Sequence, residues 1–205
     1  GSLLGDNRLG EAGTGTGRQF ATVSGCSGAC EAIPRVLTVD MGTVIQLSMG
    51  AHHGCALNSQ GRLYCWGAND NLQVGIQSAE LCGGIPCVRE PQLLPHLQGI
   101  ADVALGAEHS CVLSLQGTVQ CWGNNRFGQL GVGAEGALVP GGPVHTLTPH
   151  LVGALPRATA ITANSGTSCA RTEEGRILCW GHNEHAQAGT ACYEAQAFPT
   201  EIHFQ

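Results

Sequence analysis

The sequence predicts an all-β fold made of repeated hairpins, and three observations support this prediction. Glycine and proline, which favour turns, contribute 31 and 9 of the 205 residues. The charged fraction of 12% is about half the usual share, and 42% of the residues are hydrophobic, which argues against a disordered chain. A segment bounded by two cysteines occurs three times at nearly constant spacing. Together these features favour many short strands joined by tight turns.

The repeated segment has the form of a β-hairpin that ends in Cys-Trp-Gly. Its copies are residues 55–67, 111–123 and 169–181. The tryptophans within them, Trp66, Trp122 and Trp180, recur 56 and then 58 residues apart. This period fits one propeller blade with a variable insertion and is too long for most helical repeats. Because the tryptophans occupy the same place in every copy, we expect them to pack in the core.

The spacing of the cysteines predicts a disulfide across each hairpin. Pairing Cys55 with Cys65 leaves residues 59–61 as a three-residue loop that ends in glycine, a common hairpin connection. Directly opposed residues of an antiparallel ladder have Cα atoms about 4.5–5.5 Å apart, which a disulfide can bridge. We therefore expect the pairs Cys55–Cys65, Cys111–Cys121 and Cys169–Cys179.

A second repeated motif, here called the tail, follows each hairpin. The tails are residues 5–13, 67–75, 123–131 and 181–189, and each begins and ends with glycine. Glycine at the end of the tail indicates a turn with positive φ or a close backbone approach. One asparagine recurs in the same register of every tail, which indicates a structural role for Asn7, Asn69, Asn125 and Asn183.

Alternating segments before the hairpins predict the remaining strands of each repeat. Residues 44–50, 100–106 and 159–163 have the period of a strand. Farther upstream, apolar pieces that begin with proline, such as 34–37 and 91–94, are expected to start a further strand. Four short strands in each repeat form a blade of a β-propeller.

The second repeat resembles the repeat of the regulator of chromosome condensation family. The resemblance rests on Leu105-Gly106, His109, Gly117 and residues 122–131, and related motifs cover nearly the whole chain. It implies a seven-bladed propeller, of which the 205 residues contain about three and a half four-stranded repeats. The expected organisation is a single propeller portion, residues 1–205. It divides into the tail of an incomplete blade (1–15), three repeats (16–78, 79–134 and 135–192) and the start of another incomplete blade (193–205).

An open half ring would expose unpaired sheet edges, which are prone to aggregation. We therefore expect further blades from a longer chain or from another subunit. The founding member of the family exchanges nucleotide on a small GTPase and docks on nucleosomes, but neither function maps onto residues of this sequence. The family also includes a secreted bacterial β-lactamase inhibitor and other secreted or surface proteins of bacteria. Eleven cysteines favour that branch, and hence a secreted, periplasmic or cell-surface location.

Composition excludes several classes of function. The net charge is −6 and all nine basic residues are arginine, so the chain lacks the positive surface that nucleic-acid binding requires. No stretch approaches the roughly 20 apolar residues that span a bilayer. No signal peptide is visible, so a secreted protein would be present here in trimmed form. Paired carboxylates, a phosphate loop and a Ser/His/Asp arrangement do not stand out, so we expect no catalytic residues, no cofactor and no enzymatic activity.

The remaining five cysteines lie in insertions that follow the tails. We expect local disulfides Cys26–Cys30 and Cys82–Cys87. The alternative is a metal or redox pair, but zinc sites usually need two such pairs or additional spaced histidines. Cys192 has no evident partner, so it is expected to be unpaired or to form an intermolecular bond. A reactive nucleophile is the alternative, although no base is assigned to it.

Variable insertions on a rigid scaffold are usual places for binding, so the leading hypothesis is a module that binds another protein through these loops. The alternative for the insertions is that they are tolerated surface loops. His53 and His109 occupy the entry to a hairpin, which favours a packing or hydrogen-bonding role over metal ligation. Two other functions stay open: a structural subunit of an extracellular assembly, and an enzyme that uses the central opening of the propeller.

Overall fold

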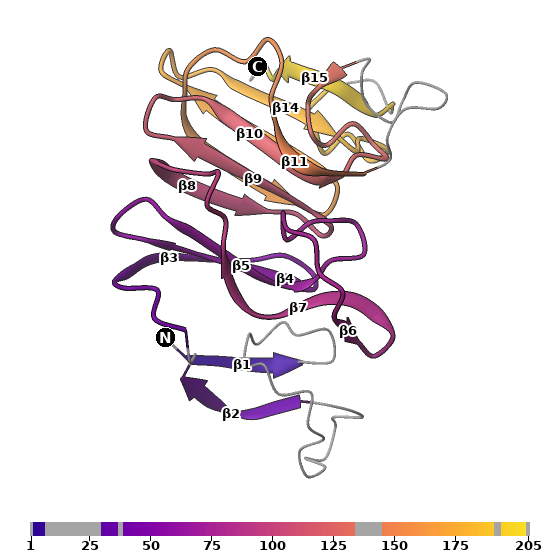
Figure 1. Ribbon diagram of the computed structural model, residues 1–205. Coiled ribbons are helices and arrows are strands. Elements are labelled where there is room, and N and C mark those ends of the chain that lie inside the picture. The colour runs from indigo at the N-terminus through magenta and orange to yellow at the C-terminus, as the bar shows by residue number, and fades with distance from the viewer. Residues whose placement is uncertain (1, 7–29, 37–38, 134–144, 191–193, 204–205) are drawn as a thin grey trace.

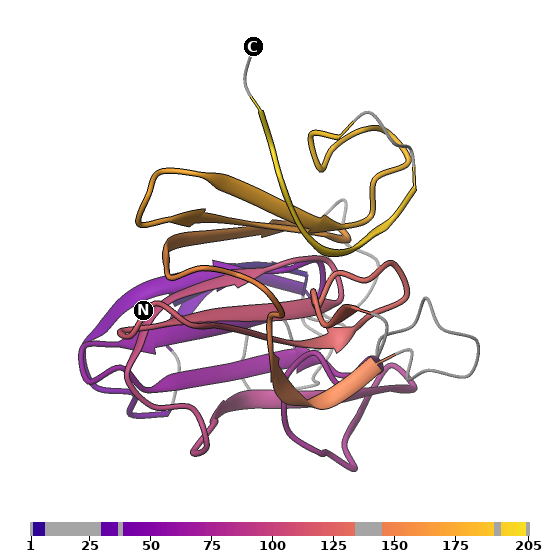
Figure 2. The same cartoon turned by 90° about the horizontal axis from the view of Figure 1, so that it is seen from above.

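The computed structural model describes residues 2–6, 30–36, 39–133, 145–190 and 194–203 (Figure 1). These residues form antiparallel sheets that are stacked one upon the next along the chain (Figures 1 and 2). Strands of neighbouring sheets contact each other, as β3 does with β8 and β8 with β12. Within this part of the chain no helix is long and apolar enough to span a membrane.

Three sheets contain four consecutive strands, and the first has one short strand more. The first sheet comprises β3 (Val44–Met49), β4 (His53–Asn58), β5 (Leu63–Ala68), β7 (Ile85–Leu93) and the added β6 (Leu81–Cys82). The second sheet comprises β8 (Ile100–Leu105), β9 (His109–Ser114), β10 (Val119–Asn124) and β11 (His145–Leu151). The third sheet comprises β12 (Ala158–Asn164), β13 (Thr167–Thr172), β14 (Ile177–Gly181) and β15 (Gln196–Glu201).

The N-terminal strands form a sheet that is half as wide. In it, β1 (Ser2–Asp6) pairs with β2 (Cys30–Val36), and the register shifts between Leu3 and Gly5. The third and fourth strands of the complete sheets show the same shift, for example between Cys65 and Gly67. The pair β1–β2 therefore corresponds to the third and fourth strands of a blade. The described strands amount to three and a half blades, as the repeats predict.

The three hairpin disulfides form at directly opposed positions of the second and third strands. Their Cα atoms are 4.1 Å apart in each case, closer than the usual spacing of the ladder. The hairpin turns end at Gly61, Gly117 and Gly175, whose φ angles are 70°, 82° and 80°. Glycine is needed there because residues with a Cβ atom adopt a positive φ only with strain.

The boundaries between the observed sheets differ from the predicted boundaries between repeats. The segment around Pro91 closes the first sheet by pairing with β5, instead of opening the next blade. Likewise β15, with Pro199, closes the third sheet and does not start an incomplete blade. The predicted boundaries are wrong because proline was expected to start a strand. Pro91 and Pro199 instead lie inside the fourth strand, in the stretch where the register shifts. That strand is at the edge of its sheet or next to it, where a missing N–H weakens the ladder little.

The core lies between the sheets. One cluster joins Leu57 and Leu63 of the first sheet to Val103, Val112 and Trp122 of the second. A matching cluster joins the second sheet to Trp180 of the third. Each sheet is thus stabilised mainly by the neighbour against which its hairpin packs, as expected for repeats stacked in series.

Candidate binding face

All four insertions leave the sheets at the same face of the stack. The strand pairs from which the insertions leave are Asp6–Cys30, Ala68–Cys87, Asn124–His145 and Gly181–Gln196. Each insertion therefore connects the end of a third strand to the start of a fourth. Because adjacent strands are antiparallel, the turns between first and second strands lie on this face too. We call it the insertion face, and call the opposite face, which carries the hairpin turns, the tip face.

Buried amide side chains shape the tails that support the insertions. In each of the three tails that the structure describes, the recurring asparagine (Asn69, Asn125 or Asn183) accepts a hydrogen bond from the backbone N–H five residues later, at 3.0, 3.1 and 2.8 Å. A glutamine spans the same loop, and Gln73 Oε1 accepts the N–H of Asn71 at 2.8 Å. Asn7, the fourth predicted member, lies outside the described residues. The asparagines therefore hold the base of each insertion in one conformation.

A chain of buried hydrogen bonds connects the first sheet to the second. His53 Nε2 lies 2.9 Å from Ser110 Oγ, and Ser110 Oγ donates to the carbonyl oxygen of Gln73 at 2.7 Å. The indole Nε1 of Trp122 donates to the same carbonyl at 2.9 Å. His53 and Gln73 belong to the first sheet and its tail, whereas Ser110 and Trp122 belong to the second sheet. This chain fixes the tail against the neighbouring blade.

The second and third sheets repeat this arrangement. His109 Nε2 lies 2.8 Å from Ser168 Oγ, and Ser168 Oγ donates to the carbonyl of Gln129 at 3.1 Å. Trp180 Nε1 donates to that carbonyl at 2.8 Å. The first tryptophan of the series, Trp66, is fully buried as well. The repeated tryptophans and histidines thus serve packing and contacts between blades.

The two histidines have strongly lowered pKa values. Burial lowers the pKa of His53 to about 3, with smaller contributions from His109 and His52, and burial lowers the pKa of His109 to about 4. Both rings are therefore neutral at physiological pH. Sequence reasoning did not identify their partners Ser110 and Ser168, although both serines precede the first cysteine of a hairpin and could have been found from that repetition.

The insertion of the first sheet is a small disulfide-stabilised hairpin. The strands β6 and β7 pair across Gly83 and Gly84, and Cys82 and Cys87 form a disulfide with Cα atoms 5.8 Å apart. Arg89 Nη2 donates to the carbonyl of Leu81 at 2.7 Å, which ties the two strands further. This pair of cysteines thus forms the predicted local disulfide.

The other cysteine predictions are not tested. Cys26 and Cys192 lie outside the described residues, and Cys30 begins β2. Among the residues that the structure describes, no group of three or more His, Cys, Asp or Glu side chains is arranged to hold a metal ion.

The insertion hairpin borders a concave site that reaches the second sheet. This site, here called the inter-blade groove, has a volume of about 550 Å³ and is lined by Asn69, Asp70, Leu72, Gln77, Ser78, Ala79, Pro86 and His145. His145 begins β11, so the wall of the groove comes from two blades. The volume is within the range of roughly 300–1,000 Å³ that is typical of binding clefts.

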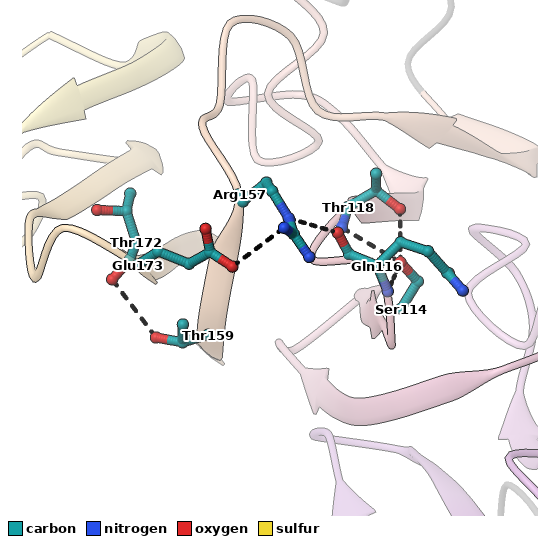
Figure 3. A network of polar contacts seen from close by, with 7 residues as sticks. All are labelled: Ser114, Gln116, Thr118, Arg157, Thr159, Thr172 and Glu173. Carbon is teal, nitrogen blue, oxygen red and sulfur yellow. Dashed lines mark hydrogen bonds and ion pairs between the residues drawn. The ribbon is translucent and has the colours of Figure 1, made fainter.

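The two faces differ in how their carboxylates are paired. On the tip face, Arg157 bridges two blades, since its Nε donates to the carbonyl of Gln116 and its Nη1 lies 3.4 Å from Glu173 Oε1 (Figure 3). On the insertion face, Asp70 accepts a hydrogen bond from Gln73, and Glu108 accepts one from Asn124. These donors are neutral amides, so the two contacts leave the charges of Asp70 and Glu108 unneutralised.

Comparison with known proteins agrees with this architecture. Two family models described as the regulator of chromosome condensation repeat match the chain, one at residues 44–73, 100–129 and 158–187 and the other at residues 60–113. Together the matched segments span more than half of the 205 residues. The chain belongs to the regulator of chromosome condensation repeat family.

Relatives of this family member include much larger proteins. It is 31% identical over 159 residues to human HERC6, a probable E3 ubiquitin-protein ligase, and the match covers 76% of this chain and 15% of HERC6. It is 34% identical over 167 residues to rat HERC4, also named a probable E3 ubiquitin-protein ligase, with 78% of this chain and 14% of HERC4 covered. The chain therefore spans about one seventh of the length of these ligases.

Solved structures show the same fold. Prp20p from Saccharomyces cerevisiae superposes with a TM-score of 0.75 at 21% identity, over 99% of this chain and 46% of Prp20p. Human WBSCR16 superposes with a TM-score of 0.74 at 18% identity, over 98% of this chain and 46% of WBSCR16. Prp20p has been characterised for its binding to Gsp1p and histones.

Proposed function

We propose that this member of the repeat family is a protein-binding module of an oxidising, extracytoplasmic compartment, and that it binds through its insertion face. The observation that carries the proposal is the common origin of all four insertions on one face. Loops of unlike sequence on one rigid surface can specify a partner without disturbing the blades beneath. Because the tails already hold the bases of the loops, ordering of these bases costs no conformational entropy on binding.

The disulfides support the choice of compartment. Eight of the cysteines in the described residues are joined in pairs, three across hairpins and one in the insertion of the first sheet. Such bonds persist in oxidising compartments and are rare in the cytosol. A location outside the cytoplasm is therefore part of the proposal.

We assign no catalytic activity to the repeats. The relatives named as ligases are about seven times longer, so most of their length lies outside the matched region. Binding is also the simpler use of the inter-blade groove, because its lining contains a single carboxylate, Asp70. Protein binding by the related propeller Prp20p is a precedent for this role.

We further propose that blades outside residues 1–205 complete the ring, and that they belong to the same polypeptide. The incomplete sheet contains only strands that correspond to the third and fourth of a blade. A second copy has no spare first and second strands, because each complete sheet uses its own. A longer polypeptide supplies them directly, so it is preferred over ring closure by another copy.

Loop exchange tests the binding proposal. In the variant, residues 77–86 are replaced by a short glycine-containing turn and Cys87 is changed to serine, so that the loss of Cys82 leaves no unpaired thiol. Arg157→Ala on the tip face is the matched control. Binding partners are captured from the extracytoplasmic fraction of the source cells, and their affinity is then measured by titration. We expect loss of binding for the exchange and little change for the control. Equal affinity of both variants and the parent would contradict binding through this insertion.

A structural role in an extracellular assembly is the second candidate. The observation that favours it is an exposed apolar strand, β3, whose large hydrophobic side chains Val44, Ile45, Leu47 and Met49 are 37–62% exposed. Sedimentation at several protein concentrations separates the two roles. Concentration-dependent assembly of the complete polypeptide favours the structural role, whereas a monomer favours the binding module.

A further inference from the structure

The hydrogen-bond chain between the first and second sheets determines the tautomer of His53. The hydroxyl of Ser110 has one proton, which it donates to the carbonyl of Gln73. Ser110 Oγ can therefore only accept from the imidazole, so the proton of the ring is on Nε2. The same reasoning places the proton of His109 on Nε2, because Ser168 Oγ donates to Gln129.

Nδ1 of each ring is therefore a bare nitrogen in a closed space. Neither His53 Nδ1 nor His109 Nδ1 has a hydrogen-bond partner, and both atoms are buried. A glycine backs each ring, and a Cβ added at Gly50 or Gly106 would be only 2.6 or 2.3 Å from the Nδ1 atom. A second proton on either imidazole would thus be an unpaired buried donor that carries charge, which is strongly unfavourable.

Among the residues that the structure describes, no carboxylate forms a hydrogen bond or ion pair with either ring, whose Nε2 atoms contact serine hydroxyls. The titratable groups that act on His53 are His52 on its own turn and His109 on the second sheet, and both are bases. The tail of the first sheet carries one acid, Asp70, which accepts a hydrogen bond from Gln73. Burial alone lowers the pKa of His109, and its chain neighbour Glu108 accepts a hydrogen bond from Asn124. The tail of the second sheet carries Arg126, and on the tail of the third sheet His182 and Glu184 pair with each other. Protonation therefore requires that the ring leave its site.

Each buried ring lies at the junction of two blades, and the inter-blade groove lies over the first junction. Gln73, which accepts from Ser110, belongs to the same tail as Asn69, Asp70 and Leu72 of the groove. The opposite wall, His145, belongs to the second sheet. Separation of the two sheets at His53 would therefore alter the width of the groove.

We propose that the two His–Ser contacts are acid-sensitive latches whose opening at mildly acidic pH loosens the junctions between blades and reshapes the inter-blade groove. The effect of pH on binding rests on the proposed function, whereas the opening of the junctions does not depend on it. The chain itself contains a variant without the titrating ring. Thr167 replaces histidine at the equivalent position of the third sheet, and its hydroxyl donates to the carbonyl of His182.

The test is hydrogen exchange of the parent protein between pH 7 and 4.5, with its disulfides intact and rates corrected for the pH dependence of intrinsic exchange. Below pH 6 we expect the open fraction at each junction to rise about tenfold for each pH unit, since opening is coupled to uptake of one proton. The amides of residues 69–79 and 145–151 report on the groove. The indole N–H groups of Trp122 and Trp180 report on the two junctions.

Two double variants keep the test decisive. H53Q/H109Q retains an N–H donor for each serine without a titrating ring, and H53T/H109T copies the third sheet. In a variant that folds, we expect the open fraction to change less than about twofold for each pH unit. An acid response as steep as that of the parent would overturn the proposal, as would protonation of both imidazoles, followed by NMR, without loss of indole protection. Because no partner takes part, failure here is distinguishable from failure of the binding proposal.

Discussion

The backbone of the tails provides a comparison at the level of single residues. Leu72, Gly128 and Ala186 occupy the same tail position and have φ angles of 61°, 77° and 57°. Left-handed geometry costs an L-residue roughly 1–2 kcal/mol, whereas glycine adopts it freely and loses about 0.5–1 kcal/mol of backbone entropy. We therefore expect Ala186→Gly to raise the free energy of unfolding by about 0.5 kcal/mol.

The reverse change at Gly128 has a second, steric cost. A Cβ there would be 2.8 Å from the Cα atom of Ala197 in β15, which is backbone and cannot move freely. We expect Gly128→Ala to lower the free energy of unfolding by roughly 1–3 kcal/mol. Denaturant titration measures both changes, and a change of the same sign for the two variants would contradict the shared geometry.

Stability at acidic pH follows from the same two buried histidines. Their folded pKa values, about 3 and about 4, are below the unfolded value near 6.5, so the unfolded chain binds more protons below that pH. Their contribution to stability is complete above pH 6.5 and is lost as the pH falls toward about 4 for His109 and about 3 for His53. At pH 5 each histidine lowers the free energy of unfolding by ~2 kcal/mol. Thermal melts at pH 7 and 5 check this, with H53Q/H109Q expected to lack most of the difference.

The disulfides differ in how much of the fold each one stabilises. Cys111–Cys121 joins buried strands of the second sheet, and closing a loop of this size stabilises a fold by about 3 kcal/mol. Cys82–Cys87 lies in an insertion at the rim. We expect Cys82→Ser/Cys87→Ser to speed hydrogen exchange of residues 80–88 and to leave residues 109–121 unchanged. Cys111→Ser/Cys121→Ser is expected to speed exchange throughout the second sheet; uniform acceleration by both pairs would refute this separation.

The success of sequence reasoning also varied by element. The hairpins were predictable because cysteine spacing, loop glycines and alternation all specify one register. The fourth strands were assigned to the wrong blade because proline usually marks a strand end, whereas Pro91 and Pro199 lie where the register shifts. The groove could not be predicted, since it depends on how residues 76–79 meet His145 across two blades, and no repeat encodes that contact.

At the scale of the whole molecule, the stacking of sheets in series gives residues at equivalent repeat positions different exposures to solvent. Leu105 of the second sheet is 5% exposed because the first sheet covers it, whereas Met49, at the same repeat position, is 45% exposed. The neighbour on that side has only the strands β1 and β2. A buried leucine truncated to alanine costs about 2–5 kcal/mol, and an exposed side chain costs much less.

We therefore expect Leu105→Ala to lower the free energy of unfolding of residues 1–205 by at least ~2 kcal/mol, and Met49→Ala by less than ~1 kcal/mol. The comparison also tests ring completion. In a polypeptide that supplies the first two strands of the incomplete blade, Met49 becomes buried, so both substitutions should then cost a similar amount. A small effect of Met49→Ala in the longer protein as well would mean that β3 stays uncovered, which would favour a surface that contacts another molecule over a closed ring.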